Sequence, residues 1–278
     1  MTGRARMGAG GESEMRKPNT SRCESRRILG VDFYAGDVEG AIDQISGGGL
    51  LVVPAAPALK DIASNEPYRE AITNADVAIP DSAFMVLLWN WFEGDSLTRL
   101  SGLKYLRQLL LRDDVRAAGN TFWVMAGKAS SEKNIRWLAS EGIAVPASCI
   151  YEAPMYGSEI DDPLLIERLQ DRHVKHIVIT IGGGTQERLG MYLKRNLNYR
   201  PAIHCIGAAI AFLSGDQVKI PDWADRLYLG WFFRCVSAPT RYVPRYWSAV
   251  KLVPLLRRYR EQLPPLQAVT PPAAGAEA

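Results

Sequence analysis

The stretch His176-Ile-Val-Ile-Thr-Ile-Gly-Gly-Gly184 joins an apolar run, typical of a buried strand, to a glycine turn. A helical pattern follows from Gln186 to Leu197, and the next apolar run covers 202–210. Short apolar runs that alternate with amphipathic helices are typical of βαβ units, in which the strands are parallel. The sequence therefore predicts an α/β fold with a Rossmann-like, largely parallel sheet flanked by helices.

The same alternation extends from this stretch toward the N-terminus. The predicted strands there are 50–55, 76–81, 121–127 and 147–151, and the predicted helices are 58–74, 82–91, 102–118, 130–141 and 164–172. Pro163 stands where the first turn of a helix tolerates proline. We therefore expect one α/β domain over residues 28–221.

Composition and charge fit one globular domain. The 278 residues are 47% apolar and 23% charged, which excludes a collagen, a coiled coil and a wholly disordered chain. A net charge of +3 is too small to indicate a general nucleic-acid-binding protein. The four cysteines form no CxxC pair and have no histidine at metal-ligand spacing, so neither a zinc site nor a disulfide framework is predicted. No cofactor is expected.

Two tails and a basic segment flank the predicted domain. Residues 1–27 and 263–278 lack periodicity and are predicted to be disordered. Neither a signal peptide nor an apolar run of about 18 residues is present, so we expect the protein to stay in the cytoplasm. Residues 222–262 form a basic, aromatic, helical appendage. Between 226 and 260 there are eight cations, three of them Arg234, Arg241 and Arg245, and no acidic residue.

The appendage has three possible interpretations: a packed pair of amphipathic helices, a nucleic-acid surface, or an element that lies on an anionic bilayer. Aromatic side chains such as Trp231 and Trp247 are interleaved with its cations. Each cation near an anionic bilayer contributes about 1 kcal/mol of binding free energy. We favour the bilayer, because cations and aromatics together suit the membrane interface.

Ligands of open α/β sheets bind outside the carboxyl ends of the strands, so the turns there are the candidate sites. Asp81 follows a predicted strand and could accept a proton from a substrate hydroxyl, or it could simply cap the next helix. Lys128, after Gly127, could pair with a diphosphate, or it could be a solvated surface side chain. The three histidines, His173, His176 and His204, are expected to be packed rather than to bind ligands.

The turn Gly182-Gly183-Gly184-Thr185-Gln186-Glu187 resembles a phosphate-binding turn at a helix N-terminus. The alternative is an ordinary left-handed turn in which Thr185 caps the helix and Glu187 lies in the first helical turn. The spacing is neither GxGxxG nor a P-loop. A nicotinamide-dependent oxidoreductase is therefore disfavoured.

Taken together, these residues resemble the bacterial WecG/TagA/CpsF glycosyltransferases, glycosyltransferase family 26, from about Ile28 to Tyr246. The marks of the resemblance are the segments 75–81, Arg99 with Gly102, Gly127-Lys128, Gly182 to Glu187, Phe212 to Gly215, Pro221 to Trp223, Trp231 to Arg234, Pro239 to Arg241, and Arg245-Tyr246. One departure is Pro54-Ala55-Ala56, which stands where the family has a polar Thr-x-Asn turn.

The resemblance implies a metal-independent, inverting hexosyltransferase that moves a sugar, such as N-acetylmannosamine, from a UDP donor. The acceptor would be a sugar linked to undecaprenyl diphosphate at the inner face of the cell membrane, for surface-glycan synthesis. Asp81 would be the general base, with Arg99 and Gln186 in the same pocket. Arg234, Arg241 and Arg245 would bind the diphosphate, and Gly127, Lys128, Gly183, Gly184, Thr185 and Glu187 would contact substrate. The alternative is a catalytically silent relative that binds a nucleotide or lipid-linked ligand in a polysaccharide-assembly complex. Either interpretation is compatible with a homo-oligomer.

Overall fold

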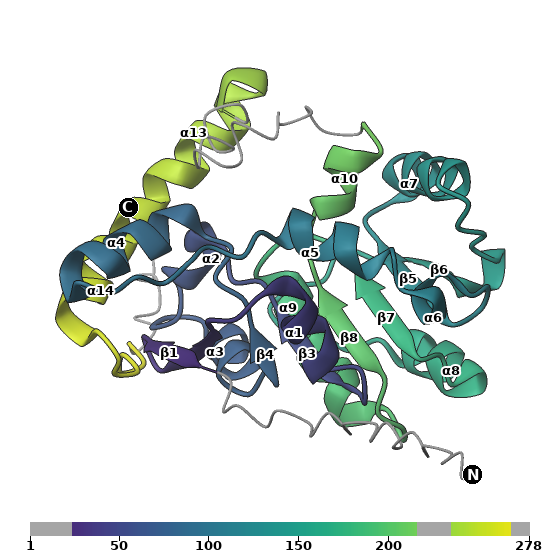
Figure 1. The fold of residues 1–278 in the computed structure, drawn as a ribbon, viewed down its shortest axis with the longest axis horizontal. Helices are drawn as coiled ribbons and strands as arrows, with labels where there is room; N and C mark the ends of the chain where they lie inside the picture. Colours follow the sequence, from purple (N-terminus) through teal and green to yellow (C-terminus); the bar gives the residue numbers. More distant parts are fainter. Residues whose placement is uncertain (1–23, 216–234, 268–278) are drawn as a thin grey trace, which may run out of the picture.

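The computed structural model describes residues 24–215 and 235–267. Its core is an eight-stranded sheet in the order β1-β2-β4-β3-β8-β7-β5-β6 (Figure 1). The strands are β1 Ser25–Ile28, β2 Val31–Tyr34, β3 Gly49–Val52, β4 Val77–Ala78, β5 Thr121–Met125, β6 Ile150–Glu152, β7 His176–Ile179 and β8 Ala202–Cys205. The pair β1–β2 is antiparallel, and the other pairings of the described strands are parallel. The predicted fold class is confirmed.

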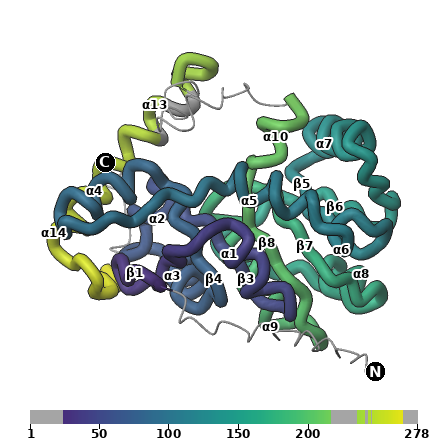
Figure 2. The backbone as a smooth tube through the Cα atoms, in the orientation of Figure 1, coloured from purple at the N-terminus to yellow at the C-terminus, as the bar shows by residue number. Residues whose placement is uncertain are grey.

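Helices cover both faces of this sheet, and Figure 2 shows α1 and α5 on its near side. The described α-helices are α1 Val38–Gln44, α2 Ala56–Leu59, α3 Glu66–Thr73, α4 Ala83–Glu93, α5 Gly102–Leu109, α6 Asp113–Arg116, α7 Lys128–Ser140, α8 Pro163–Arg172, α9 Thr185–Asn196, α10 Ala209–Leu213, α13 Pro239–Ser248 and α14 Leu252–Tyr259. Two short 3₁₀ helices, η1 Ala147–Cys149 and η2 Ala249–Lys251, complete the set.

Alternation along the strands creates two apolar cores. In β3, Leu50 and Val52 join the core under α2, α3, α4, α8, α9 and α14, whereas Leu51 joins the core under α1, α5, α6, α7 and α10. Successive side chains of a strand point to opposite faces, so a continuous apolar run can fill both cores. The sheet is therefore buried on both sides, and its carboxyl edge carries the open turns.

Two predicted helices are each broken in the structure. The predicted helix 58–74 is α2 and α3 with a turn between them, because Asn65 accepts a hydrogen bond from the Tyr68 N–H and starts a new helix. Pro67 lies in the first turn of α3, where its missing N–H is tolerated. The predicted helix 102–118 is likewise α5 and α6, since Arg112 has an extended backbone.

All six predicted strands are shorter than expected. The runs 50–55, 76–81 and 121–127 leave the sheet at Val52, Ala78 and Met125. The runs 176–184 and 202–210 leave the sheet at Ile179 and Cys205, and the chain then turns through Gly184 and Gly207, whose φ angles are positive. The run 147–151 begins as η1, after Pro146, and pairs in the sheet only from Ile150.

The ends of the described chain are packed on the domain, which corrects two predicted boundaries. The strand β1 begins at Ser25, within the predicted tail 1–27, and Arg26 forms an ion pair with Asp95 at 3.0 Å. Residues 263–267, predicted to be disordered, also contact the domain, since the Gln267 N–H donates to the Ala63 carbonyl at 2.7 Å. The rest of both predicted tails lies outside the described residues.

The predicted appendage 222–262 is partly integrated into the main domain. Leu252 and Leu256 of α14 are buried in the core that also contains Met85 of α4. The N–H groups of Leu29 and Gly30 donate to the carbonyls of Arg260 and Glu261 at 2.7 and 2.9 Å. Helix α14 therefore closes one end of the sheet. Among the described helices, none combines the length and apolarity that crossing a bilayer requires.

Candidate active site

Asp81 lies at the carboxyl edge of the sheet, in the turn between β4 and α4. Its Oδ1 accepts hydrogen bonds from the Arg99 guanidinium at 3.2 Å and from the Gly102 N–H at 3.0 Å. The Arg99 Nε also donates to the Asp81 carbonyl oxygen at 2.6 Å. The cap of α4 is Ser82, whose Oγ accepts from the Met85 N–H at 3.2 Å. Asp81 is thus not the helix cap, and its side chain remains 29% exposed.

Gln186 joins the turns that follow β7 and β8. Its side-chain oxygen accepts a hydrogen bond from the Gly207 N–H, and its amide nitrogen donates to Glu187 Oε1 at 3.0 Å. Both Gln186 and Glu187 are buried. The hydrogen bonds of the Gln186 side chain therefore hold the turn after β7 against the turn after β8.

Gly102, the first residue of α5, lies near both Asp81 and the turn that binds Gln186. A Cβ atom placed at Gly102 would lie 3.3 Å from Val53 Cγ1 and 3.9 Å from the carbonyl oxygen of Ile206. Gly102 therefore packs between the ends of β3 and β8, next to the Gly207 N–H that binds Gln186. The three residues predicted to be catalytic, Asp81, Arg99 and Gln186, thus lie along one edge of the sheet, with Gly102 near both Asp81 and the turn that binds Gln186.

The glycine turn lies at the N-terminus of α9, and Glu187 is in the first turn of that helix. Gly184, with φ 91°, is the N-cap of α9, and Thr185 is the first helical residue. Glu187 Oε2 accepts the Gly184 N–H at 2.6 Å. The expectation that Thr185 caps the helix is wrong, because the Glu187 carboxylate reaches back to the cap residue itself. Arg188 braces the turn by donating from Nε to the Gly184 carbonyl at 3.2 Å.

A pocket of about 350 Å³ opens beside this turn. Its lining combines the glycine turn with the segment that joins α2 to α3 and with the end of α13. The lining residues are Pro57, Ala58, Lys60, Asp61, Asn65, Tyr68, Gly183, Gly184, Thr185, Arg188 and Ser248. Both cationic and hydroxyl groups are present, as a polar, negatively charged ligand requires.

Two features of the pocket wall bear on its chemistry. The Lys60 ammonium pairs with its neighbour Asp61 at 2.5 Å. The Tyr68 hydroxyl is buried and has no hydrogen-bond partner within the described residues. Burial, together with the negative charges of Glu187 and Asp61, raises the pKa of Tyr68 well above its usual value, so the hydroxyl keeps its proton.

Several of the predicted substrate-binding residues do not line this pocket, and others lie outside the described residues. Gly127 and Lys128 begin α7 and are exposed, and their strand β5 is the neighbour of β7 at the same edge of the sheet. Arg241 and Arg245 belong to α13, whose helix continues through Pro244. Their side chains, and all of Arg234, lie outside the described residues.

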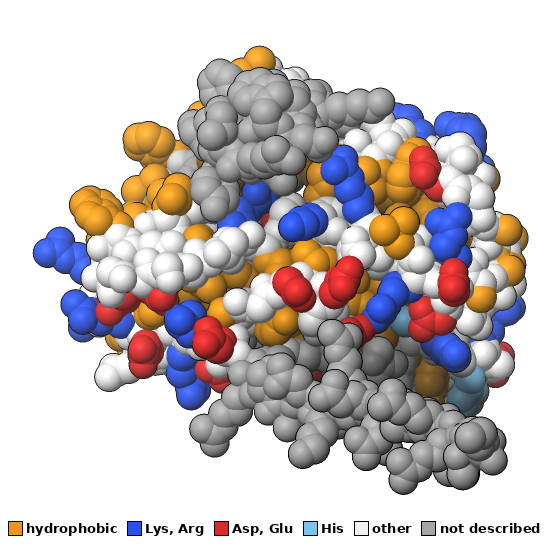
Figure 3. Space-filling model, viewed as in Figure 1, with side chains coloured by type: hydrophobic (Ala, Val, Ile, Leu, Met, Phe, Trp, Pro, Cys, Tyr) orange, Lys and Arg blue, Asp and Glu red, His pale blue; other side chains and the backbone are white. Residues whose placement is uncertain are grey.

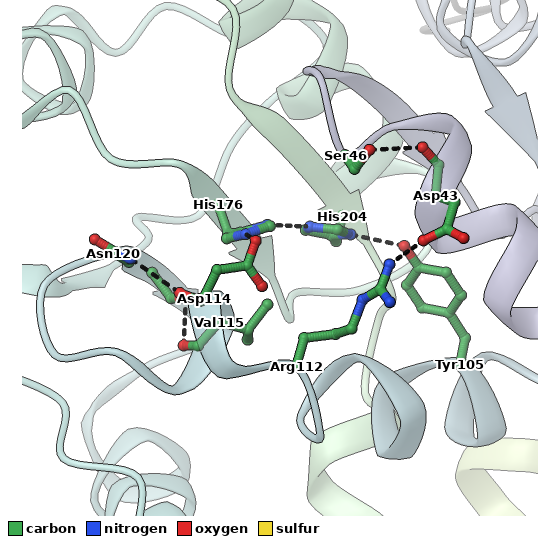
Figure 4. A network of polar contacts seen from close by, with 10 residues as sticks. Asp43, Ser46, Tyr105, Arg112, Asp114, Val115, Asn120, His176 and His204 are labelled. Carbon is green, nitrogen blue, oxygen red and sulfur yellow. Dashed lines mark hydrogen bonds and ion pairs between the residues drawn. The ribbon is translucent and has the colours of Figure 1, made fainter. Parts of the chain in front are cut away.

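Two of the three histidines form a buried polar chain away from this edge. Figure 4 shows Asp114, His176, His204 and Tyr105 in a row. The distances along the row are 3.2 Å from Asp114 to His176, 3.2 Å between the two imidazoles, and 2.8 Å from His204 to the Tyr105 hydroxyl. The expected packed role is confirmed for these two residues. His173 is instead exposed, at the left-handed C-terminal position of α8, where it stacks on Tyr199.

The α2–α3 wall of the pocket was not predicted from the sequence. Lys60, Asn65 and Tyr68 fall within the range predicted as one continuous helix. The Asn65-Glu66-Pro67 signature of a helix start could have indicated the break there. The contact between this wall and the glycine turn is tertiary, since a Cβ atom at Gly184 would lie 3.9 Å from Ala58 Cβ. Local sequence patterns carry no signal for such a contact.

Comparison with known proteins gives one family. The model of the glycosyl transferase WecG/TagA/CpsF family matches residues 26–266, which include the described sheet, apart from Ser25, and the candidate site at its carboxyl edge. A comparison with curated proteins gave no match. The long match agrees with the eight-stranded α/β fold. The chain therefore belongs to the WecG/TagA/CpsF family of glycosyltransferases.

Proposed function

We propose that this glycosyltransferase moves a hexose, such as N-acetylmannosamine, from a UDP-sugar to a sugar carried on polyprenyl diphosphate. The transfer would be metal-independent and would invert the configuration at the anomeric carbon. It would take place at the cytoplasmic face of the membrane, in surface-glycan synthesis. Family membership supports a nucleotide-sugar donor and a lipid-linked acceptor in general terms. The specific donor and acceptor are part of the proposal.

The observation that carries the proposal is the fixed carboxylate of Asp81. Arg99 and the Gly102 N–H both bind its Oδ1, and Ser82 takes the capping role that would otherwise occupy it. A carboxylate held at the open edge of the sheet can act as a general base. It would take the proton of the acceptor hydroxyl while that oxygen bonds to the anomeric carbon, and UDP would leave with the electrons of the broken C–O bond.

The leaving UDP gains negative charge in the transition state, which cationic and N–H groups can stabilise. The N-terminus of α9 offers the backbone of Gly183, Gly184 and Thr185, and Lys60 and Arg188 line the same pocket. Lys128, which follows the neighbouring strand β5, and Arg234, Arg241 and Arg245 are further candidates for these contacts. In this proposal Glu187 and Gln186 hold the turns in place, while a direct catalytic role of Gln186 stays a prediction.

Replacing Asp81 by Asn tests the general base. The amide keeps the size of the side chain and an acceptor oxygen, but it cannot take up the proton. We expect UDP release that depends on the lipid-linked acceptor to fall by about 10²- to 10⁴-fold, with UDP binding retained. Asp43→Asn, at an exposed site on α1, is the matched control and should retain full activity. Full activity of Asp81→Asn would refute the assignment.

A second candidate is a relative that binds these ligands without turnover. It is favoured by one observation: Ala55, at the start of α2, provides no side-chain hydrogen bond where the family has a polar turn. In that case UDP would bind, and no donor in a panel of UDP-sugars would release it. Detection of acceptor-dependent release with any donor would exclude this candidate.

A further inference from the structure

Helix α4 carries a stripe of apolar side chains that faces away from the core. Met85, Val86 and Trp89 are buried. On the opposite side of the helix Phe84, Leu87 and Trp91 are 37%, 53% and 80% exposed. The exposed residues are spaced three and four apart, so they form one continuous stripe.

A second exposed stripe runs along α13 and η2. Val243, Trp247 and Val250 are 48%, 78% and 50% exposed, and they too are spaced four and three apart. The chain continues from η2 into α14, and α14 packs against α4. The two stripes thus come from segments far apart in the sequence, and α14 connects them because it follows η2 and packs against α4. Figure 3 shows apolar side chains gathered along the upper left edge of the molecule, over α13 and the adjoining ends of α4 and α14.

Positive charge accompanies these stripes. Lys251, Arg257 and Arg258 are exposed at the end of η2 and on α14, and no acidic residue occurs between Pro239 and Arg260. Figure 3 shows Lys and Arg side chains beside the apolar groups at the left edge. Exposed tryptophan and aliphatic side chains with adjacent cations match the interface of an anionic bilayer, in which apolar groups enter the acyl boundary and cations meet phosphate.

We propose that the α4 and α13 stripes together form one surface, Phe84, Leu87, Trp91, Val243, Trp247 and Val250, which docks into an anionic phospholipid bilayer. The α/β domain itself then contacts lipid through α4, in addition to the C-terminal helices. The inference rests on the proposed function, in which a lipid-linked acceptor must reach the site from the bilayer. Ser82, the N-cap of α4, directly follows Asp81, so docking through α4 brings the edge that carries the carboxylate toward the membrane.

Flotation of the full chain with vesicles tests the surface. The vesicles are phosphatidylcholine with or without phosphatidylglycerol, and the test variant is Leu87→Ser with Trp91→Ser. We expect binding to phosphatidylglycerol vesicles to fall by about tenfold or more, because two large apolar groups no longer enter the interface. The matched control is Leu111→Ser with Leu164→Ser, which removes two leucines that are 66% and 50% exposed on other elements. It should bind like the unmodified chain.

Activity assays separate this inference from the proposed function. The α4 variant should lose turnover of a long-chain acceptor in vesicles and keep turnover of a short-chain, water-soluble acceptor. If neither the unmodified chain nor any variant releases UDP, the proposed function is refuted. Vesicle binding still tests the docking surface in that case. Unchanged vesicle binding by the α4 variant would overturn the inference. Equal binding to vesicles with and without phosphatidylglycerol would also overturn it. A further contrary result would be a dimer, seen by sedimentation velocity, that dissociates in the α4 variant while vesicle binding persists.

Discussion

Gly190 shows how the close approach of α9 to the sheet depends on one missing side chain. A Cβ atom at this position would lie 2.5 Å from Cys205 Sγ and 2.6 Å from Leu50 Cδ1, both of them buried on strands β8 and β3. Contacts that short do not occur between real side chains, so a larger residue would push the helix away. The same helix begins at the glycine turn of the candidate site, and its position therefore sets the position of that turn.

Gly190→Ala should lower the free energy of unfolding by about 1–2 kcal/mol. Alanine favours a helix by up to about 1 kcal/mol over glycine, but overpacking a core costs about 1–3 kcal/mol. Urea unfolding measures the net effect. Gly47→Ala is the control, because no atom lies within 4 Å of a Cβ placed there. Its effect should stay within about 0.5 kcal/mol, and a stabilised Gly190→Ala protein would contradict the packing described above.

At the scale of single elements, Asp162 does more than cap α8. Its carboxylate accepts the Leu165 N–H at 3.0 Å, the Tyr151 hydroxyl at 2.8 Å and the Tyr156 hydroxyl at 2.6 Å. The cap thereby links the helix to strand β6 and to the loop between them. Burial and hydrogen bonding to Asp162 raise the pKa of Tyr151 to about 12.

Asp162→Ala should lower the free energy of unfolding by about 3 kcal/mol, since it removes a cap and leaves two tyrosine hydroxyls without their acceptor. The comparison is Asp37→Ala, which removes only the exposed cap of α1 and should cost about 1 kcal/mol. Urea unfolding gives both values. In Asp162→Ala, Tyr151 should also ionise at lower pH in a spectrophotometric titration. Equal losses in the two variants would show that the tyrosine contacts add nothing.

The elements differ in how far the sequence alone could predict them. The central strands could be placed because apolar runs such as 121–125 are buried on both faces, and burial on both faces dictates composition directly. The breaks within 58–74 and 102–118 were missed because both halves of each keep the helical period. Asp81 and the glycine turn could be located from the rule that sites lie at strand carboxyl ends. Tyr68 could not, because it reaches the turn only through tertiary packing.

At the scale of the whole molecule, the row of Asp114, His176, His204 and Tyr105 links α5 and α6 to β7 and β8 deep in the fold. Burial, and to a smaller degree the neighbouring His176, lowers the pKa of His204 well below its ordinary value of 6.5. Burial also lowers the pKa of His176, although Asp114 opposes this and Lys175 and Arg112 reinforce it. Both imidazoles are thus neutral in the folded protein at neutral pH.

This row predicts a loss of stability in mild acid. The unfolded chain protonates its histidines near pH 6.5, while the folded chain resists protonation, so the unfolded state binds more protons as the pH falls below 6.5. The stabilisation is fully present above that pH and declines below it, by about 2 kcal/mol for one histidine at about pH 5. Urea unfolding at about pH 7.5 and pH 5 measures the change. His204→Gln should show a smaller change, and an identical pH dependence would exclude His204 as its source.

The backbone bonds from Leu29 and Gly30 to Arg260 and Glu261 have a consequence for biosynthesis. A ribosome delivers the first hairpin long before it delivers α14, which supplies Leu252 and Leu256 to the core beside α4. During that interval the nascent chain exposes the apolar face that α14 later covers, and it is open to chaperones. Translation must therefore proceed past residue 261 before α14 can complete the domain. A truncated mRNA that ends before this point is expected to give a chain that is degraded rather than a smaller enzyme.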